Sequence, residues 1–383
     1  MYDDVVAFIR ETFGTDGKIP LHEPRFRGNE KAYVADAIDS TFVSSVGEYV
    51  ARFERAVADY VGCGHAVATV NGTAALHAAL VVAGVRDGDE VITQPLTFVA
   101  TANAIAYCRA KAVFVDVDLD TCGLSAQALR AFLERNAEVR NGACVNRKTG
   151  RVIRACVPMH AFGHPCRIGD IAAICAEWNI TLVEDAAEAL GSRSEGRHVG
   201  HAGPLGVLSF NGNKIITTGG GGMIVTDDPG IARHAKHVTT TAKRDHQWEF
   251  AHDEIGFNYR MPNLNAALGC AQMEMLPSFL AAKRRLAARY QAFFEGRSER
   301  FLCEPAGTES NYWLNCITAP DCAARDAFLK ATNEAGVMTR PAWVLIPSLA
   351  MYADCECGPM ANAERLADTL ISLPSSVIED SED

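Results

Sequence analysis

The sequence predicts an α/β fold in which a mostly parallel sheet carries helices on both faces, with a second, smaller domain towards the C-terminus. From residue 66 onward, short apolar runs of strand length alternate with helical sequence, which is the pattern produced when helices connect parallel strands. Polar side chains follow several of these runs, at the strand ends where such sheets bind ligands. After about residue 301 a further strand and helix are expected, and we assign them to the smaller domain.

An arm and two helices are expected before the sheet begins. Two prolines and a glycine interrupt the first segment, so residues 1–28 are predicted to form an irregular arm. Asn29 can cap a first helix, and apolar residues at helical spacing predict a second helix over about 47–61.

Strands and helices then follow in alternation. The expected strands are 66–70, 90–94, 112–116, 154–159, 180–184, 205–210, 223–226 and 312–318, and the clearest helices are 73–83, 168–178, 263–294 and 323–335. A Gly-rich turn between 210 and 223 predicts a hairpin, and Pro277 is expected to interrupt the long helix. The predicted domains are 29–275 for the large domain and 276–383 for the small one.

Composition and charge exclude several classes of protein. The chain has 383 residues and a net charge of −11, which argues against nucleic acids and anionic membranes as partners. No apolar run approaches the roughly 18 residues of a membrane span, and the acidic N-terminus lacks the order of a secretory signal. We therefore expect a cytoplasmic protein whose thirteen cysteines are reduced thiols.

Lys214 and Asp185 predict the cofactor. Asp185 ends the apolar strand 180–184, and Lys214 lies in a turn that follows strand 205–210 and precedes four glycines. Pyridoxal phosphate needs an amine that forms a Schiff base and an acid that keeps its pyridine nitrogen protonated. This pair of side chains, each at a strand end, suits that cofactor.

Further side chains at strand ends complete a candidate site. Thr73 opens a helix after strand 66–70, where backbone N–H groups and a hydroxyl can hold a phosphate. Phe98 could stack on a flat ring, and Glu188 could face the edge of the ring. Each residue alone is more often structural, but the combined order of Thr73, Phe98, Asp185, Ser209 and Lys214 favours a cofactor site.

These segments resemble the DegT/DnrJ/StrS family of pyridoxal-phosphate sugar aminotransferases. The resemblance extends from Phe42-Val43-Ser44-Ser45-Val46-Gly47 to Leu373-Pro374-Ser375-Ser376 and includes Asn-Gly-Thr-Ala-Ala-Leu, Glu-Asp-Ala-Ala and Ser-Phe-x-x-x-Lys in the family's order. It implies the aspartate-aminotransferase-like architecture (fold type I).

The resemblance also implies roles for single residues. Lys214 would be the Schiff-base lysine and Asp185 the partner of the pyridine nitrogen, with Phe98 stacked on the ring. The phosphate would be held by Thr73, Ala74 and Ser209, and by Asn258 of the neighbouring subunit. The implied assembly is therefore a homodimer with shared active sites.

Two positions depart from the family pattern. Gly220 stands where a glutamate is frequent, and Glu188 stands where glutamine or histidine is frequent. The Phe-Asn-Gly-Asn-Lys segment resembles the branch that aminates C4 of UDP-4-keto-6-deoxy-N-acetylhexosamines with L-glutamate as donor. A GDP- or dTDP-linked keto sugar is the alternative. Candidate substrate residues are Ser45, His160, Arg260 and Arg340, with Arg25 and Arg27 as further cations for a diphosphate.

Other functions fit the sequence less well. A related sugar dehydratase would carry histidine in place of Lys214, and a nicotinamide oxidoreductase would need G-x-G-x-x-G after the first strand. A non-catalytic sugar-responsive regulator stays open. His160, His164 and Cys166 have the spacing of metal ligands, but the intervening Gly163 and Pro165 disfavour a helix that would align them, so no metal is expected.

Overall fold

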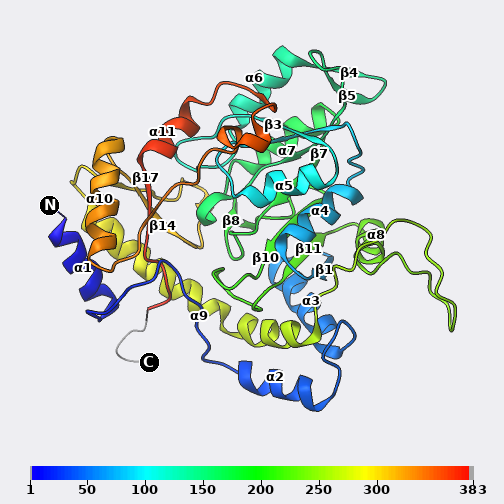
Figure 1. Cartoon of the computed structure of the whole chain (residues 1–383), viewed down its shortest axis with the longest axis horizontal. Coiled ribbons are helices and arrows are strands. Elements are labelled where there is room, and N and C mark those ends of the chain that lie inside the picture. The colour runs from blue at the N-terminus through cyan, green and yellow to red at the C-terminus, as the bar shows by residue number, and fades with distance from the viewer. Residues whose placement is uncertain (1, 379–383) are drawn as a thin grey trace.

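An eight-stranded sheet forms the centre of the computed structural model, which describes residues 2–378 (Figure 1). The strand order is β1-β11-β10-β7-β6-β2-β3-β16. Strand β11 is antiparallel to both of its neighbours, and the pairs from β10 to β16 are parallel. The predicted mixed, mostly parallel sheet is thus confirmed, as is the hairpin of β10 and β11. The bounds are β1 His65–Thr69, β2 Glu90–Thr93, β3 Lys111–Phe114, β6 Ile153–Val157, β7 Thr181–Asp185, β10 Leu205–Ser209, β11 Gly222–Thr226 and β16 Glu356–Cys357.

Helices cover both faces of this sheet because successive strand residues point to opposite sides. In β11, Ile224 packs in one core with α4 and α8, whereas Met223 and Val225 pack in another with α3 and α9. A third core lies under α6 and α7. The bounds are α2 Glu30–Asp39, α3 Glu48–Val61, α4 Gly72–Val82, α5 Val99–Tyr107, α6 Ala126–Asn136, α7 Ile168–Glu177 and α8 Pro229–Thr239. Asn29 stands at the N-cap position of α2, but its amide binds Glu274 Oε2 at 2.8 Å instead of capping the helix.

The smaller α+β unit lies at the left in Figure 1 and contains a four-stranded antiparallel sheet of order β12-β14-β17-β15. Its elements are β12 Arg300–Phe301, β14 Asn315–Thr318, α10 Cys322–Glu334, β15 Arg340–Pro341, α11 Ala361–Thr369 and β17 Leu370–Leu373.

The predicted irregular arm is wrong for its first half, because α1 spans Asp3–Phe13. Acidic side chains in its first turn, Arg10 in its last turn and Gly14 in a left-handed C-cap all favour the helix. Val5 and Ile9 are buried against Tyr290 and Phe328, so α1 is part of the core of the smaller unit.

The expected break at Pro277 is also wrong, since α9 is one helix over Asn263–Phe294. A proline inside a helix costs about 3 kcal/mol. Leu276 and Phe279 beside it are buried in the core with α3, and packing of this kind offsets such a cost. The predicted domain boundary at 275/276 therefore falls within a continuous helix, shown in yellow in Figure 1.

Short elements that the sequence pattern did not predict complete the fold. They are the hairpin β4 Ala137–Arg140 and β5 Ala143–Asn146, the small sheet of β8 Arg193–Ser194, β9 Arg197–His198 and β13 Thr308–Glu309, and the 3-10 turns Ala161–Gly163, Ile346–Ser348 and Ala350–Tyr352. Within residues 2–378, no helix combines the length and the apolar character needed to cross a membrane.

Candidate active site

A cavity of about 320 Å³ lies where the sheet meets the starts of α4 and α5 and the turn after β10. Six of the residues predicted from the sequence line it, namely Thr73, Phe98, Asp185, Glu188, Ser209 and Lys214. They come from separate segments that the parallel strands bring to one edge, as expected for ligand sites in α/β sheets.

Lys214 lies between an acid and an aromatic ring. Its Nζ donates a hydrogen bond to Glu188 Oε1 at 3.2 Å and lies 4.1 Å from the centre of the Trp313 ring. The Trp313 indole N–H donates in turn to the carbonyl of Asn213 at 2.6 Å, which fixes the ring against the turn that carries the lysine. The lysine side chain is 12% exposed, so its amine can be reached from the cavity.

Asp185 is buried at the end of β7, with both oxygens already hydrogen-bonded. Thr101 Oγ1 on α5 donates to Oδ2 at 2.8 Å, and the Ala187 N–H donates to Oδ1 at 3.2 Å. Burial raises the pKa of Asp185, while these two donors and Lys214 lower it. The donors hold the carboxylate in one orientation towards the cavity.

The start of α4 and the end of β10 approach closely enough to cradle an anion. A Cβ added at Gly72 would lie 2.9 Å from the Ser209 Cβ, so no side chain fits between these segments. The first N–H groups of a helix lack partners within the helix. The Ala74 N–H binds Asn71 Oδ1 at 2.8 Å, and Ala74 does not line the cavity. Gly72, Thr73 and Ser209 do line it, and their N–H groups and hydroxyl can be offered to a phosphate.

Aromatic side chains form the walls. Phe98 lines the cavity and is 49% exposed, as expected for a ring that a planar ligand would cover. Trp343 lines it as well and stacks on Phe162, with ring centres 4.6 Å apart.

His160 does not reach the cavity. It is fully buried behind β7, where Nε2 lies 3.1 Å from Glu184 Oε2 and Nδ1 accepts from the Cys166 N–H at 3.2 Å. Burial lowers the pKa of His160, whereas Cys166 and Glu184 raise it, and the net shift is upward. His160 therefore contacts Glu184 of β7 and does not lie where a substrate in the cavity would bind.

His164 has a different aromatic neighbour from the His160–Cys166 pair. It packs edge-on against Tyr312 at 5.4 Å between ring centres. In the described part of the chain, no group of three or more histidine, cysteine or acidic side chains is arranged to hold a metal ion.

The other predicted substrate and partner-site residues lie outside this cavity. Asn258 accepts hydrogen bonds from the Arg260 guanidinium at 3.2 and 3.4 Å, in the segment that precedes α9. Arg340 binds Asn333 and the Thr339 carbonyl within the smaller unit. Arg25 binds the Val377 carbonyl and pairs with Glu23.

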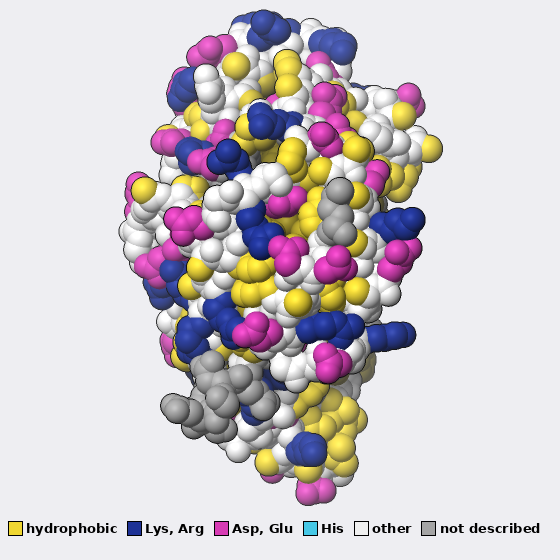
Figure 2. Space-filling model, turned by 90° about the vertical axis from the view of Figure 1, so that its left-hand side faces the viewer, with side chains coloured by type: hydrophobic (Ala, Val, Ile, Leu, Met, Phe, Trp, Pro, Cys, Tyr) yellow, Lys and Arg dark blue, Asp and Glu magenta, His cyan; other side chains and the backbone are white. Residues whose placement is uncertain are grey.

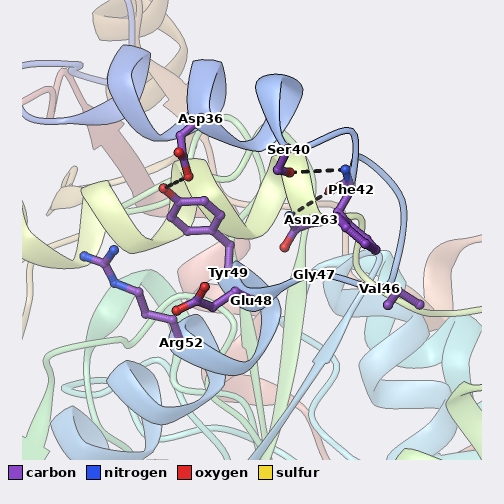
Figure 3. Close-up of a pocket in the computed structure, with 9 residues that line it drawn as sticks. All are labelled: Asp36, Ser40, Phe42, Val46, Gly47, Glu48, Tyr49, Arg52 and Asn263. Atoms are coloured by element: carbon purple, nitrogen blue, oxygen red, sulfur yellow. Dashed lines mark hydrogen bonds between the residues drawn. The ribbon is translucent and has the colours of Figure 1, made fainter.

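Ser45 belongs to the loop between α2 and α3, and its chain neighbours Val46 and Gly47 line a second cavity of about 630 Å³ (Figure 3). This cavity is larger, and its lining includes the carboxylates of Asp36 and Glu48 but no lysine that could form a Schiff base. In Figure 3, Tyr49 points its hydroxyl at Asp36, and Asn263 binds the backbone of Phe42. The chemistry therefore places the candidate active site at Lys214.

The residues around Lys214 fit pyridoxal phosphate. Asp185 offers a buried carboxylate for a ring nitrogen, and Lys214 offers an amine. Gly72, Thr73 and Ser209 offer an anion cradle into which a side chain at position 72 would intrude.

Sequence reasoning missed several residues of this site. Thr101, Trp313 and Trp343 line the cavity, and Asn211 and Asn213 flank Lys214. The asparagines lie in the segment already singled out and could have been found there. Trp313 and Trp343 belong to the smaller unit, and no local pattern predicts that they reach the strand ends of the large sheet.

Comparisons with known proteins show the family to which the chain belongs. Residues 24–383 match the model of the DegT/DnrJ/EryC1/StrS aminotransferase family. A relative named GDP-perosamine synthase, from Caulobacter vibrioides, is 34% identical over 362 residues, which cover 94% of this chain and 93% of that protein. The putative pyridoxal phosphate-dependent aminotransferase EpsN of Bacillus subtilis is 36% identical, covering 85% of this chain and 81% of that protein.

Solved structures share the fold of this chain. The aminotransferase TlmJ from Streptoalloteichus hindustanus superposes with a TM-score of 0.85 at 30% identity, covering 94% of both chains. A putative sugar aminotransferase from Streptococcus pneumoniae, solved in its PLP form, shares the fold with a TM-score of 0.84 at 21% identity. The predicted aspartate-aminotransferase-like fold is thereby confirmed. The chain belongs to the DegT/DnrJ/EryC1/StrS family and is a pyridoxal-phosphate-dependent sugar aminotransferase.

Proposed function

We propose that this enzyme transfers the amino group of L-glutamate to a keto carbon of a GDP-linked sugar. The observation that carries the proposal is that Lys214, Asp185 and the anion cradle formed by Gly72 and Ser209 line one cavity. In the overall exchange, L-glutamate becomes 2-oxoglutarate and the keto sugar becomes an amino sugar, so no other reactant is needed.

The side chains of the site would divide this work. When bound, pyridoxal phosphate supplies a carbon that carries the amino group and a ring that delocalises the electrons of a broken C–H bond. Lys214 would hold the cofactor covalently and, once released, move a proton as general acid and base. Asp185 would keep the ring nitrogen protonated, and Thr73 and Ser209 would hold the phosphate.

The nucleotide is proposed from the relatives. Several proteins about 34% identical to this chain are named GDP-perosamine synthase, including those of Escherichia coli O157:H7 and Vibrio cholerae. These names favour a GDP-linked sugar. The Phe-Asn-Gly-Asn-Lys segment, by its resemblance, predicted a UDP-linked N-acetylhexosamine instead. The UDP sugar remains the competing substrate. EpsN is 36% identical to this chain, and its name gives no nucleotide, so it does not favour either sugar.

A direct assay tests this choice. The purified holoenzyme is incubated with L-glutamate and 4-keto-6-deoxy sugars linked to GDP, UDP or dTDP, and release of 2-oxoglutarate is measured. We expect kcat/KM to be highest for the GDP sugar, by at least about 10-fold, because a nucleotide-specific contact is worth roughly 1–3 kcal/mol. A higher kcat/KM for the UDP sugar would reverse the assignment.

We also propose a homodimer with shared sites. Large apolar side chains are exposed on the loop that projects beyond α8 at the right of Figure 1, namely Trp248, Phe250 and Ile255 at 71, 81 and 85%. Phe42 and Val46 are exposed beside α2 at 56 and 67%. Figure 2 shows hydrophobic side chains gathered at the lower end of the molecule, the level of α2 in Figure 1, below a face of mixed charges. Such patches are typical of protein interfaces.

Subunit complementation tests the sharing of sites. Asn258 is exposed on the segment between the projecting loop and α9, where its Oδ1 accepts from Arg260 and its amide NH2 can serve a neighbouring site. We expect Lys214→Ala and Asn258→Ala to be inactive separately and to regain about a quarter of wild-type activity when unfolded and refolded together, because mixed dimers contain one intact site. A mixture that stays inactive while forming mixed dimers would contradict shared sites.

A further inference from the structure

Glu188 is placed to exchange a proton with Lys214. It lies in the turn after β7 with a side chain that is 1% exposed, so water does not solvate its carboxylate. One oxygen, Oε2, accepts the Phe162 N–H at 2.9 Å, which fixes the carboxyl group. The other oxygen, Oε1, faces the lysine amine at 3.2 Å. In the described chain, this is the one hydrogen bond that the Lys214 amine makes.

The neighbouring acid is engaged differently. Both oxygens of Asp185 are held by Thr101 and by the backbone, and neither is hydrogen-bonded to Lys214. Burial raises the pKa of Glu188 to about 7, even though Lys214 and the Phe162 N–H lower it. Two carboxylates in one cavity thus have separate environments, an arrangement that commonly divides acid and base roles.

The lysine needs such a partner because only a neutral amine can accept a proton. The two groups that its amine meets, the carboxylate of Glu188 and the face of the Trp313 ring, each attract an ammonium. An ammonium cannot accept a proton, so a lysine held in that form is a poor base. A neighbouring group that can take the proton removes this obstacle.

We propose that Glu188 is a catalytic residue that takes a proton from the released Lys214 and returns it during amino transfer. One N–H bond of the ammonium breaks and one O–H bond forms on Oε1. The ion pair becomes an amine and a carboxylic acid, and the total charge stays zero. In water, an ion pair of this kind is strongly favoured over the neutral acid and amine. Burial reduces this free-energy difference, so the proton can pass between the two groups.

Other titratable groups around the pair do not provide the same route. Asp185 faces both Glu188 and Lys214 but makes its own hydrogen bonds, as described above. His22 lies close enough to Lys214 for the lysine charge to act on it, and burial lowers its pKa well below the usual value. Cys316 is buried near Glu188, and burial raises the pKa of its thiol to about 12. At neutral pH, His22 and Cys316 therefore stay neutral.

The test measures Lys214 in the protein without cofactor. Acetic anhydride acylates neutral amines, and peptide mass spectrometry gives the rate at Lys214 across the neutral pH range. In the wild type, we expect a rate that is nearly independent of pH over about two units, because a constant fraction of the pairs holds a neutral lysine. In Glu188→Gln, we expect the rate to fall about tenfold per pH unit on acidification, as for a lysine alone.

Infrared spectroscopy gives a second readout. The difference spectrum between the wild type and E188Q at neutral pH should contain the carbonyl stretch of a protonated carboxyl group. Glu188→Asp moves the carboxylate oxygen away from the Lys214 amine but keeps a titratable group. The pH range over which the acylation rate at Lys214 is constant should therefore be shorter in this variant. Glu195→Gln makes the same substitution at an exposed position and should match the wild type.

The outcomes separate cleanly. The proposal would be overturned if the acylation rate at Lys214 fell tenfold per pH unit in both the wild type and E188Q. It would also be overturned if the infrared spectrum lacked a protonated-carboxyl band, because Glu188 would then stay ionised. If E188Q fails to fold, the wild-type labelling profile and the E188D profile decide. With the cofactor bound, E188Q should slow the half-reaction with L-glutamate by about 100-fold. No sugar enters any of these measurements, so an error in the proposed substrate leaves them unaffected.

Discussion

Single hydrogen bonds decide how the acids of this site are used. Asp185 sits at the end of a parallel strand, where its backbone position follows from the sheet. Its side-chain direction depends on Thr101 Oγ1, which itself lies 2.9 Å from Thr97 Oγ1. A buried chain of hydroxyl groups therefore sets the orientation of the carboxylate.

Replacing Thr101 by valine removes the hydroxyl that orients the Asp185 carboxylate and keeps nearly the same side-chain shape. The lost bond leaves a buried carboxylate oxygen without its donor, at a cost of about 1–3 kcal/mol, and raises the pKa of Asp185 further. We expect kcat to fall about 10-fold and the visible absorption of the bound cofactor to change. Thr93→Val, which loses a buried bond to the Val157 carbonyl, is the matched control. An equal loss of kcat in both variants would contradict a specific role for Thr101.

At the scale of elements, the phosphate cradle results from the packing of α4 on β10. Leu76 and Ala75 of α4 are buried with Val207 of β10 in one core, and this packing brings Gly72 against Ser209. The closeness of these two segments requires glycine at position 72 because a Cβ there would meet the Ser209 side chain.

Gly72→Ala should therefore reduce cofactor affinity. The added methyl group would push Ser209 away from the helix start and disturb the donors that we assign to the phosphate. We expect the Kd for pyridoxal phosphate, measured by fluorescence titration, to rise about 10-fold, since one charge-assisted bond is worth roughly 1.5–3 kcal/mol. Gly169→Ala in α7 adds a methyl group in open space and should leave the Kd unchanged. An unchanged Kd for G72A would place the phosphate elsewhere.

At the scale of the whole molecule, the smaller unit completes the active site through a buried junction. Asn311 Nδ2 donates to the carbonyls of Glu188 and Leu190 at 2.9 Å, and its own N–H donates to Ser192 Oγ at 3.0 Å. Gly163 lies against this side chain with a φ of 93°, where a Cβ would be only 1.9 Å from Asn311 Oδ1. This junction carries Trp313 to the amine of Lys214.

Asn311→Ala should loosen the junction and the site together. Two buried carbonyls lose their donor, so we expect the free energy of unfolding in urea to fall by about 2–4 kcal/mol. Activity should fall by at least about 10-fold because Trp313 is no longer fixed. Asn333→Ala removes amide bonds within the smaller unit alone and should affect activity much less. Full activity in N311A would show that the junction is not needed to position Trp313.

Local sequence patterns were sufficient to predict the parts of this protein that depend on neighbouring residues. Alternating apolar and helical segments predicted the large sheet, and the side chains just after its strands predicted Thr73, Phe98, Asp185, Ser209 and Lys214 at one cavity. Parallel strands bring their carboxyl ends to one edge whatever the remaining sequence, so local patterns suffice for these residues. The helix α1 also had local signals, in its acidic first turn and its Gly14 cap, that were outweighed by the prolines after it.

Contacts between distant segments determine the other features. The continuity of α9 through Pro277, the burial of His160 behind β7 and the approach of Trp313 to Lys214 depend on surfaces that are far apart in the chain. Trp313 and Lys214 are about a hundred residues apart, and burial of apolar surface between the two units brings them together. Propensity and turn chemistry act over a few residues, whereas such burial acts between whole elements, and this difference separates what was predicted from what was not.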